Sequence, residues 1–464
     1  MNSPAYSRRD FVRSTALAAG ATALSARSLA QVQGANERVG IGVIGFGLVG
    51  RIHTRNFAAL PGARVVAVSD TYEPRRHAAA ELLGSGTRLY ADFRRLLEDK
   101  AVDAVVVATP DHWHALQTMM ACAAGKDVYV EKPLHLFVRE GEWMIQVARR
   151  HQRVVQVGTQ QRSAPHYHAA KQLLREGRIG EIVSAQCNFF RNVAPGIGNP
   201  PDGAPPKDLD WDMLLGPAPQ RPYNPNRALY HFRWFWDYSG GQMTNLGHHS
   251  LDVVQWIFDL PGPTAVTSSG GRWFLKDNGE VPDVQDAIIE YPKFPAVVQF
   301  RECSAGAGST SMGSLTFMGT KGTMLLGRDG FEILPDKKVA PVNTFAKIIG
   351  GHPVGGPQPV PEAEGALWCE PAQDKSGEWK SQYVEHSKNF LECVKSRRAP
   401  HSDLETSHRV STTCHLANLS LRLGRKLRWD AGRQEVVGDA EASALLTRPY
   451  RAPWDRELQA LLKA

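Results

Sequence analysis

VGIGVIGFGLVG, residues 39–50, joins a short apolar run to a turn with glycines at 45, 47 and 50. The ten residues that follow can form a helix, so the glycines lie between a strand and a helix. In such a turn the first glycine makes the bend, the second lets the backbone approach a pyrophosphate, and the third lets the helix pack on the strand. We therefore interpret this stretch as a dinucleotide-binding turn formed by Gly45, Phe46, Gly47, Leu48, Val49 and Gly50.

Residues 38–160 alternate between β-rich and helix-like stretches. The predicted strands are 39–44, 64–68, 104–108, 127–130 and 154–157, and the clearest helices are 113–124 and 139–150. This alternation predicts a Rossmann domain, an α/β fold with a doubly wound parallel sheet. Asp70 ends the second strand, where a carboxylate accepts hydrogen bonds from the ribose of NAD. Arg75 and Arg76 follow closely enough to bind a 2′-phosphate, so NADP stays open.

The pattern changes after residue 160, and residues 161–430 form a second predicted domain. Helices are predicted at 165–176, 382–395 and 404–423, and strands at 182–190, 264–268, 287–291, 296–301, 314–318 and 323–326. These strands lack helical crossovers, which predicts an α+β domain with an open, largely antiparallel sheet. We interpret residues 431–464 as a C-terminal tail.

The first thirty residues are typical of a twin-arginine export signal. Arg8 and Arg9 precede Phe11, an apolar run extends from about residue 16 to residue 26, and small residues surround Ala30. We therefore expect residues 1–30 to be a signal peptide and the protein to be periplasmic or otherwise exported. A mildly basic tail is the alternative.

Composition excludes several classes of protein. The net charge is +7, and it falls to +4 without residues 1–30, which hold four arginines and one aspartate. Long Lys/Arg runs are missing, so nucleic acid is not an expected partner. The six cysteines form no Cys-x-x-Cys pair, and no stretch reaches the roughly 20 apolar residues of a membrane span.

Two motifs follow predicted strands of the parallel sheet, where open α/β sheets bind ligands. TPDHWH at 109–114 follows the predicted strand at 104–108, and EKP at 131–133 follows the one at 127–130. Lys132 can donate a hydrogen bond to a substrate hydroxyl, and burial can tune it for proton transfer. From these motifs we assign to the cofactor edge Thr109, Pro110, His112, His114, Glu131 and Lys132.

A third motif lies between residues 240 and 252. If the segment is an α-helix, Asn245, His249 and Asp252 share one face at i, i+4 and i+7. His249 can then remove a hydroxyl proton as hydride leaves the same carbon, and His248 is a second candidate. Metal binding by the paired histidines is the rival interpretation, but hydride transfer to NAD needs no metal and no Cys or Glu completes a ligand spacing, so we expect no metal.

Together these motifs resemble the glucose-fructose oxidoreductase, inositol dehydrogenase and rhizopine-catabolism family, usually called Gfo/Idh/MocA, in an exported branch. The resemblance covers about residues 39–425, with NLGHHSLD at 245–252 as its last motif. It implies an NAD(P)-dependent oxidoreductase of a sugar or polyol, with Lys132 and His249 beside the nicotinamide. Asn245 departs from the usual aspartate, and a neutral amide orients an imidazole less strongly. His249 should therefore be less basic, and Lys132 should carry more of the proton transfer.

The resemblance also implies a substrate pocket and a homo-oligomer interface in the second domain. Candidates for hydroxyl binding and sugar stacking are Gln160, Arg162, Tyr167, Arg191, Tyr230, Arg233 and Trp236. Export predicts a resident cofactor, because no free NAD pool is expected outside the inner membrane. A resident cofactor must be regenerated, either by reducing a second substrate or by a cycle of transient oxidation. The first case is net oxidoreduction; the second is a glycosidase or epimerase, and a non-catalytic dinucleotide sensor is the third possibility.

Overall fold

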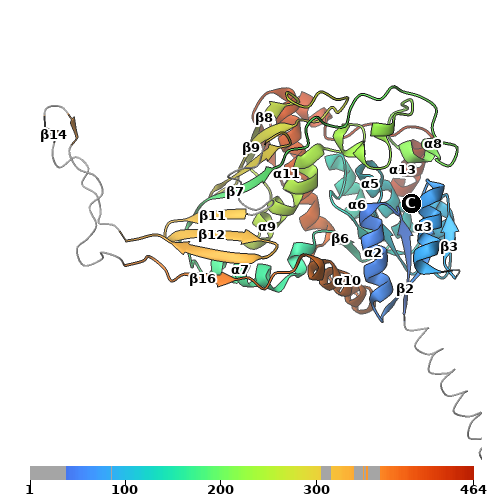
Figure 1. Ribbon diagram of the computed structural model, residues 1–464, viewed down its shortest axis with the longest axis horizontal. Helices are drawn as coiled ribbons and strands as arrows, with labels where there is room; N and C mark the ends of the chain where they lie inside the picture. The colour runs from blue at the N-terminus through green and yellow to red at the C-terminus, as the bar shows by residue number, and fades with distance from the viewer. Residues whose placement is uncertain are drawn as a thin grey trace, which may run out of the picture.

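The computed structural model describes residues 38–84, 86–304, 315–338, 348–349, 352–353 and 366–463. The export signal expected at residues 1–30 lies outside them. The N-terminal sheet and its helices occupy the right of Figure 1, and the larger second sheet lies at the left. Within the described part of the chain, no helix is long and apolar enough to cross a membrane.

The N-terminal sheet is parallel and has the order β3-β2-β1-β4-β5-β6. Its strands are β1 (Val39–Ile44), β2 (Ala63–Ser69), β3 (Arg88–Tyr90), β4 (Ala104–Val107), β5 (Asp127–Val130) and β6 (Val155–Val157). Every residue of β1, β4, β5 and β6 is buried, because helices cover both faces. The doubly wound prediction is confirmed. Only edge strand β3 went unpredicted, since three half-exposed residues make no apolar run.

The crossover helices place the loops that form the site. They are α2 (Leu48–Ala59), α3 (Glu73–Leu83), α4 (Phe93–Glu98), α5 (Asp111–Ala123) and α6 (Val138–Arg150). The strand order reverses between β1 and β4, so the loops after these two strands run in opposite directions. They leave a crevice at the carboxyl ends of the strands, which is where such sheets bind ligands.

The second sheet has the order β16-β13-β12-β11-β7-β10-β9-β8-β17-β18. Its strands are β7 (Ile182–Phe190), β8 (Ala265–Gly271), β9 (Val284–Glu290), β10 (Pro295–Arg301), β11 (Leu315–Gly319), β12 (Gly322–Gly327), β13 (Gly330–Pro335), β16 (Ala372–Asp374), β17 (Leu427–Asp430) and β18 (Glu435–Val436). β7 and β10 pair with each other in parallel, whereas β9 pairs antiparallel with β10 and β11 pairs antiparallel with β7. The sheet is therefore mixed and mostly antiparallel, as predicted. β14 (Ile348–Ile349) and β15 (His352–Pro353) form a separate ribbon.

Helices α7 (Pro165–Arg175), α9 (His248–Phe258) and α11 (Leu404–Leu423) pack against the second sheet, and Figure 1 shows α9 and α11 beside it. Their shared core includes Tyr167, Leu251, Val254, Phe300, Phe317 and Leu416. Shorter elements are η1 (Gln160–Ser163), α8 (Trp211–Leu215), η2 (Pro225–Arg227), η3 (His231–Trp234), η4 (Met243–Gly247) and α12 (Ala440–Ala444). α8, η2 and η3 belong to a long segment between β7 and α9 that reaches the crevice.

The C-terminal part of the chain returns to the Rossmann domain. On α10 (Trp379–Ser396), Phe390 packs edge-on against Phe57 and Tyr129. On α13 (Trp454–Lys463), the Trp454 ring lies 4.8 Å from that of Trp113. Residues 431–464, which we interpreted as a tail, therefore carry β18, α12 and α13 and complete the cores of both domains.

Candidate active site

A cleft lies in the crevice after β1 and β4, and the space between its lining residues, open solvent included, is about 1130 Å³. The glycine turn forms one end, and Glu131 and Lys132 lie at its wall after β5. The segment between β7 and α9 covers it from the second domain. That segment contributes Met213, Leu214, Leu229, Tyr230, Phe232, Arg233 and Ser239. The cleft is thus built by both domains, and a ligand bound in it contacts both.

The glycine turn has the geometry that a pyrophosphate needs. Gly45 has a φ of 92°, and a Cβ on Gly50 would stand 1.9 Å from the Gly45 carbonyl oxygen. Both positions therefore require glycine. Gly47 precedes the first turn of α2, and no side chain caps that turn. Its free backbone N–H groups and the helix dipole can bind an anion, so the residues present fit a dinucleotide.

Asp70 holds the glycine turn as well as lining the cleft. Its Oδ2 accepts a hydrogen bond of 2.7 Å from the Phe46 N–H, and its Oδ1 accepts one of 2.9 Å from the Tyr72 N–H. Each oxygen keeps a second lone pair that a ribose hydroxyl can use. Arg75 lies 3.7 Å from Asp70 and donates to the Leu229 carbonyl at 3.2 Å, so it links the Rossmann domain to the covering segment. Arg76 instead donates to the Asp70 carbonyl.

The TPDHWH motif divides into residues that face the cleft and residues that support it. Thr109, Pro110 and His114 line the cleft. His112 is buried elsewhere, and its Nε2 donates to the Leu214 carbonyl at 3.0 Å. Burial lowers the pKa of His112 to about 3, so the ring stays neutral. His112 therefore holds α8 against α5. We expected it at the cofactor edge, but it does not line the cleft. Both ring nitrogens of His114 face carbonyl oxygens.

Glu131 and Lys132 differ in their partners. Glu131 Oε1 accepts a 2.6 Å hydrogen bond from His53. Burial raises the pKa of Glu131, but the hydrogen bond and charge of His53 outweigh it and leave the pKa below its usual range. Lys132 Nζ donates to Asn245 twice, to Oδ1 at 2.8 Å and to the backbone oxygen at 3.1 Å. Burial lowers the pKa of Lys132, which brings the amine nearer to proton transfer at neutral pH.

Asp111 is a cleft residue that we quoted within its motif but did not assign to the site. It is the first residue of α5, and its Oδ2 accepts a 2.5 Å hydrogen bond from Ser239. Burial raises the pKa of its carboxyl group, and Lys132 and Arg233 are close enough to oppose that shift. Its position directly after Pro110, at the carboxyl end of β4, was the available signal. Ser239 had none, because it comes from a distant loop.

The segment around Asn245 does not form the α-helix that we expected. Met243–Gly247 is a π-helix, and α9 begins at His248. A π-helix has more residues per turn, so the i, i+4, i+7 spacing no longer aligns the three side chains. Asn245 lines the cleft, whereas His249 does not. His249 is buried beside the charges of Lys132 and Arg328, and burial, followed by these charges, holds its pKa well below the usual value.

Comparisons with known proteins agree on one family. Residues 39–159 match the model of the Gfo/Idh/MocA oxidoreductase family with its NAD-binding Rossmann fold. Residues 196–269 and 375–456 match the C-terminal alpha/beta domain of the same family. The chain belongs to the Gfo/Idh/MocA family.

Two inositol dehydrogenases of Saccharopolyspora erythraea are similar to this Gfo/Idh/MocA chain. Inositol 2-dehydrogenase 1 is 40% identical over 32% of this chain and 45% of its own length. Inositol 2-dehydrogenase 2 is 38% identical over 53% of this chain and 60% of its own length. The chain thus spans about half the length of the curated relatives it matches.

A solved structure shares the fold. The scyllo-inositol dehydrogenase of Lactobacillus casei, with bound NAD(H) and scyllo-inositol, has a TM-score of 0.58 and 18% identity. The match covers 84% of this chain and 98% of that one. The two-domain arrangement around the cleft is therefore common to both proteins.

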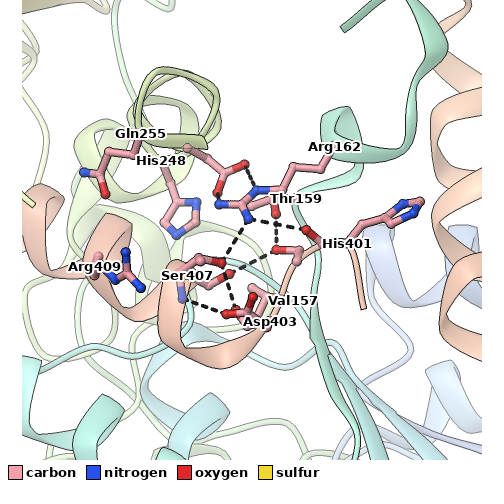
Figure 2. A network of polar contacts seen from close by, with 12 residues as sticks. Val157, Thr159, Arg162, His248, Gln255, His401, Asp403, Ser407 and Arg409 are labelled. Atoms are coloured by element: carbon pink, nitrogen blue, oxygen red, sulfur yellow. Dashed lines mark hydrogen bonds and ion pairs between the residues drawn. The ribbon is translucent and has the colours of Figure 1, made fainter. Parts of the chain in front are cut away.

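His248 and Arg162 are buried and do not line the cleft. His248 is fully buried, and its Nε2 lies 3.0 Å from Ser411 Oγ on α11. Arg162 forms a bidentate ion pair with Asp252 at 2.9 and 2.7 Å, and it also donates to Thr406. Figure 2 shows this network between α9, η1 and the start of α11. Arg162 therefore ties three elements together, a role that the motif spacing did not reveal.

The other substrate candidates fall into two groups, those that line the cleft and those that do not. Arg233 and Tyr230 line the cleft, and the Arg233 guanidinium lies 4.4 Å from the Tyr230 ring centroid. Gln160 and Tyr167 are buried away from the cleft. The remaining candidates lie outside it, with Trp236 beside Arg422 in a neighbouring hollow and Arg191 paired with Glu302. Burial or an internal partner takes these residues out of reach of a ligand in the cleft.

Proposed function

We propose that the chain is an NAD-dependent oxidoreductase that oxidises a secondary alcohol of a sugar or polyol. The observation that carries the proposal is the position of Lys132, which lines the same cleft as the glycine turn and is held by Asn245. The printed names of the curated relatives, inositol dehydrogenases, support a polyol or sugar as the substrate class.

The residues have distinct roles in this proposal. Gly45, Gly47 and Asp70 would hold NAD, which would supply the hydride acceptor for oxidation of the substrate carbon. Lys132 donates a hydrogen bond to the reacting hydroxyl and stabilises negative charge on that oxygen as the C–H bond breaks. His249 lies outside the cleft and burial lowers its pKa, so it would accept the hydroxyl proton only through a bridging water molecule. NADP remains an alternative cofactor because Arg75 lines the cleft next to Asp70.

The same proposal includes export and a resident cofactor. The twin-arginine pattern at Arg8 and Arg9 supports export. The covering segment supports retention, because Leu229, Tyr230 and Phe232 line the same cleft as the glycine turn. A cofactor that stays bound must be returned to its starting state by a second carbonyl substrate. We rank redox-assisted glycoside cleavage second, since His248 is fully buried and its Nε2 lies 3.0 Å from Ser411 Oγ.

The test uses the protein purified from the exported fraction. We expect NAD(H) in the supernatant after denaturation, and we expect a panel of sugars and inositols to change the absorbance of the bound cofactor at 340 nm. Lys132→Met should abolish this change, whereas Lys388→Met, at an exposed ion pair with Glu385, should not. Release of a glycoside without net oxidation would favour the cyclic alternative. Bound cofactor with no response to any substrate would favour a sensor.

A further inference from the structure

A chain of hydrogen bonds leads from Lys132 into the second domain. Lys132 Nζ donates to Asn245 Oδ1 at 2.8 Å, and Asn245 Nδ2 donates to Gln242 Oε1 at 3.1 Å. Gln242 Nε2 then donates to Glu302 Oε1 at 2.8 Å. Glu302 follows β10 directly and forms a bidentate pair with Arg191 at 2.8 and 2.6 Å. Glu302 and Gln242 are buried, so water does not compete strongly for these bonds.

Glu302 and Lys132, at the two ends of this row of hydrogen bonds, determine how the side-chain amides between them are oriented. An ionised carboxylate only accepts hydrogen bonds, so Glu302 requires the NH₂ group of Gln242 to face it. The Gln242 oxygen then points to Asn245 and requires the Asn245 NH₂ group. This leaves the Asn245 oxygen toward Lys132, which as an amine or ammonium donates. A flip of either amide would place donor against donor or acceptor against acceptor.

The geometry at Lys132 follows from this orientation. Two of its N–H groups are taken by the Asn245 side-chain and backbone oxygens. Nζ is tetrahedral and bonded to Cε, so one vertex remains. In the ammonium this vertex is an N–H donor, and in the neutral amine the lone pair can occupy it.

We propose that Glu302 is a positioning residue, which orients the Gln242 and Asn245 amides so that the remaining vertex of Lys132 is kept for the substrate hydroxyl. This inference rests on the proposed function, in which Lys132 contacts the reacting group. It assigns to the second domain a role in the proton transfer. It also links the neutral Asn245 side chain, through Gln242, to a carboxylate.

Other charges also act on Lys132. Glu131 and Asp111 favour its ammonium form, whereas Arg233 and Arg328 oppose it. His249 and His248 pack nearby and are affected by its charge. None of these groups takes part in the hydrogen bonds from Lys132 to Glu302. A substitution of Glu302 should therefore leave their effect on the Lys132 pKa unchanged.

The first experiment measures the ionisation of Lys132 without relying on catalysis. The protein is labelled competitively with acetic anhydride across a pH series, and the Lys132 peptide is quantified by mass spectrometry. Glu302→Gln should lower the midpoint of labelling by on the order of one pH unit, because a buried charge is lost and the amides can flip. Gln242→Met keeps the Glu302–Arg191 pair and should lower it similarly. An unchanged midpoint in folded Gln242→Met protein would overturn the proposal.

The second experiment uses a double-mutant comparison of thermal stability. Asn245→Asp places two acceptor-only groups on either side of Gln242, whose single NH₂ group then serves both poorly. Glu302→Gln should therefore lower Tm in the wild-type background and raise it in the Asn245→Asp background. The same loss in both backgrounds would mean that Glu302 only anchors Arg191, and the proposal would fail.

The two proposals can fail separately. If labelling and stability respond as expected but no sugar or polyol is oxidised, the orientation role of Glu302 stands and its catalytic purpose falls with the proposed function. If oxidation occurs, Glu302→Gln should shift the pH profile of kcat with little change in KM. An unshifted profile would overturn the role of Glu302 while leaving the oxidoreductase intact.

Discussion

Two buried charge clusters use similar residue types but differ in how completely the protein satisfies them. In the closed cluster, Arg162 and Asp252 pair with each other, and Thr406 takes another guanidinium N–H. In the open cluster, Lys132 and Asp111 line the cleft, and among the described residues their side chains hydrogen-bond to the neutral Asn245 and Ser239. A charge that is fully paired holds the fold, whereas one with spare bonding capacity at a cavity is available to a ligand.

The largest effect is expected in the open cluster. Lys132→Met should lower turnover by about 10²–10⁴-fold, the range for loss of a group that acts in proton transfer. Thermal stability should hold or rise, since a buried amine is replaced by an apolar side chain. Steady-state kinetics and a melting curve test both expectations, with Lys388→Met as the matched surface control. Retained turnover would remove Lys132 from the mechanism.

The closed cluster should respond in stability. Arg162→Met leaves the Asp252 carboxylate buried without its partner, so we expect a loss of about 3–5 kcal/mol in the free energy of unfolding. The double variant Arg162→Met/Asp252→Leu removes both charges and should recover much of that loss. Urea unfolding measures the difference. A double variant no more stable than the single one would mean that the network, and not the unpaired charge, dominates.

Acid should also weaken the closed cluster through its neighbour His386. Its Nε2 donates to the Val157 carbonyl, its Nδ1 lies 2.7 Å from Ser163 Oγ, and burial lowers its pKa to about 3. Because the unfolded chain binds the proton more readily, stability is complete above pH 6.5 and falls as the pH drops toward 3. The slope from this group is up to about 1.4 kcal/mol per pH unit. His386→Gln should flatten the urea-unfolding profile between pH 6.5 and 4.5, whereas substitution of exposed His77 should leave it unchanged.

The smallest effect is expected at Arg75, which lines the same cleft as the open cluster and joins the glycine turn to Leu229. A partly exposed link of this kind contributes at most about 1 kcal/mol, so Arg75→Ala should speed release of NADH by about threefold. Stopped-flow fluorescence of the bound nicotinamide gives the rate. Arg95→Ala, at an exposed pair with Glu98, is the control. An unchanged rate would show that the apolar side chains of the covering segment alone retain the cofactor.

Local patterns predicted the regular elements well. The strand at 182–190 and the helix at 404–423 occur at the predicted bounds. Strand β3 was missed because three residues at the edge of a sheet carry little apolar pattern. Strands β13, β16, β17 and β18 of the second sheet were also missed. The π-helix before His248 was not predicted, since the i, i+4, i+7 spacing assumes a regular α-helix and does not register an extra residue per turn.

The sequence by itself determined the dinucleotide turn, because Gly45 and Gly50 meet steric demands within one strand-turn-helix unit. It also determined which motifs reach the edge of the parallel sheet, since strand ends and ligand sites coincide in such folds. The tertiary structure alone decided which side chains form hydrogen bonds and ion pairs with one another. Glu302 reaches Lys132 through two amides, and Arg162 meets Asp252 across ninety residues. Such contacts depend on how elements far apart in the sequence pack together, which no local spacing encodes.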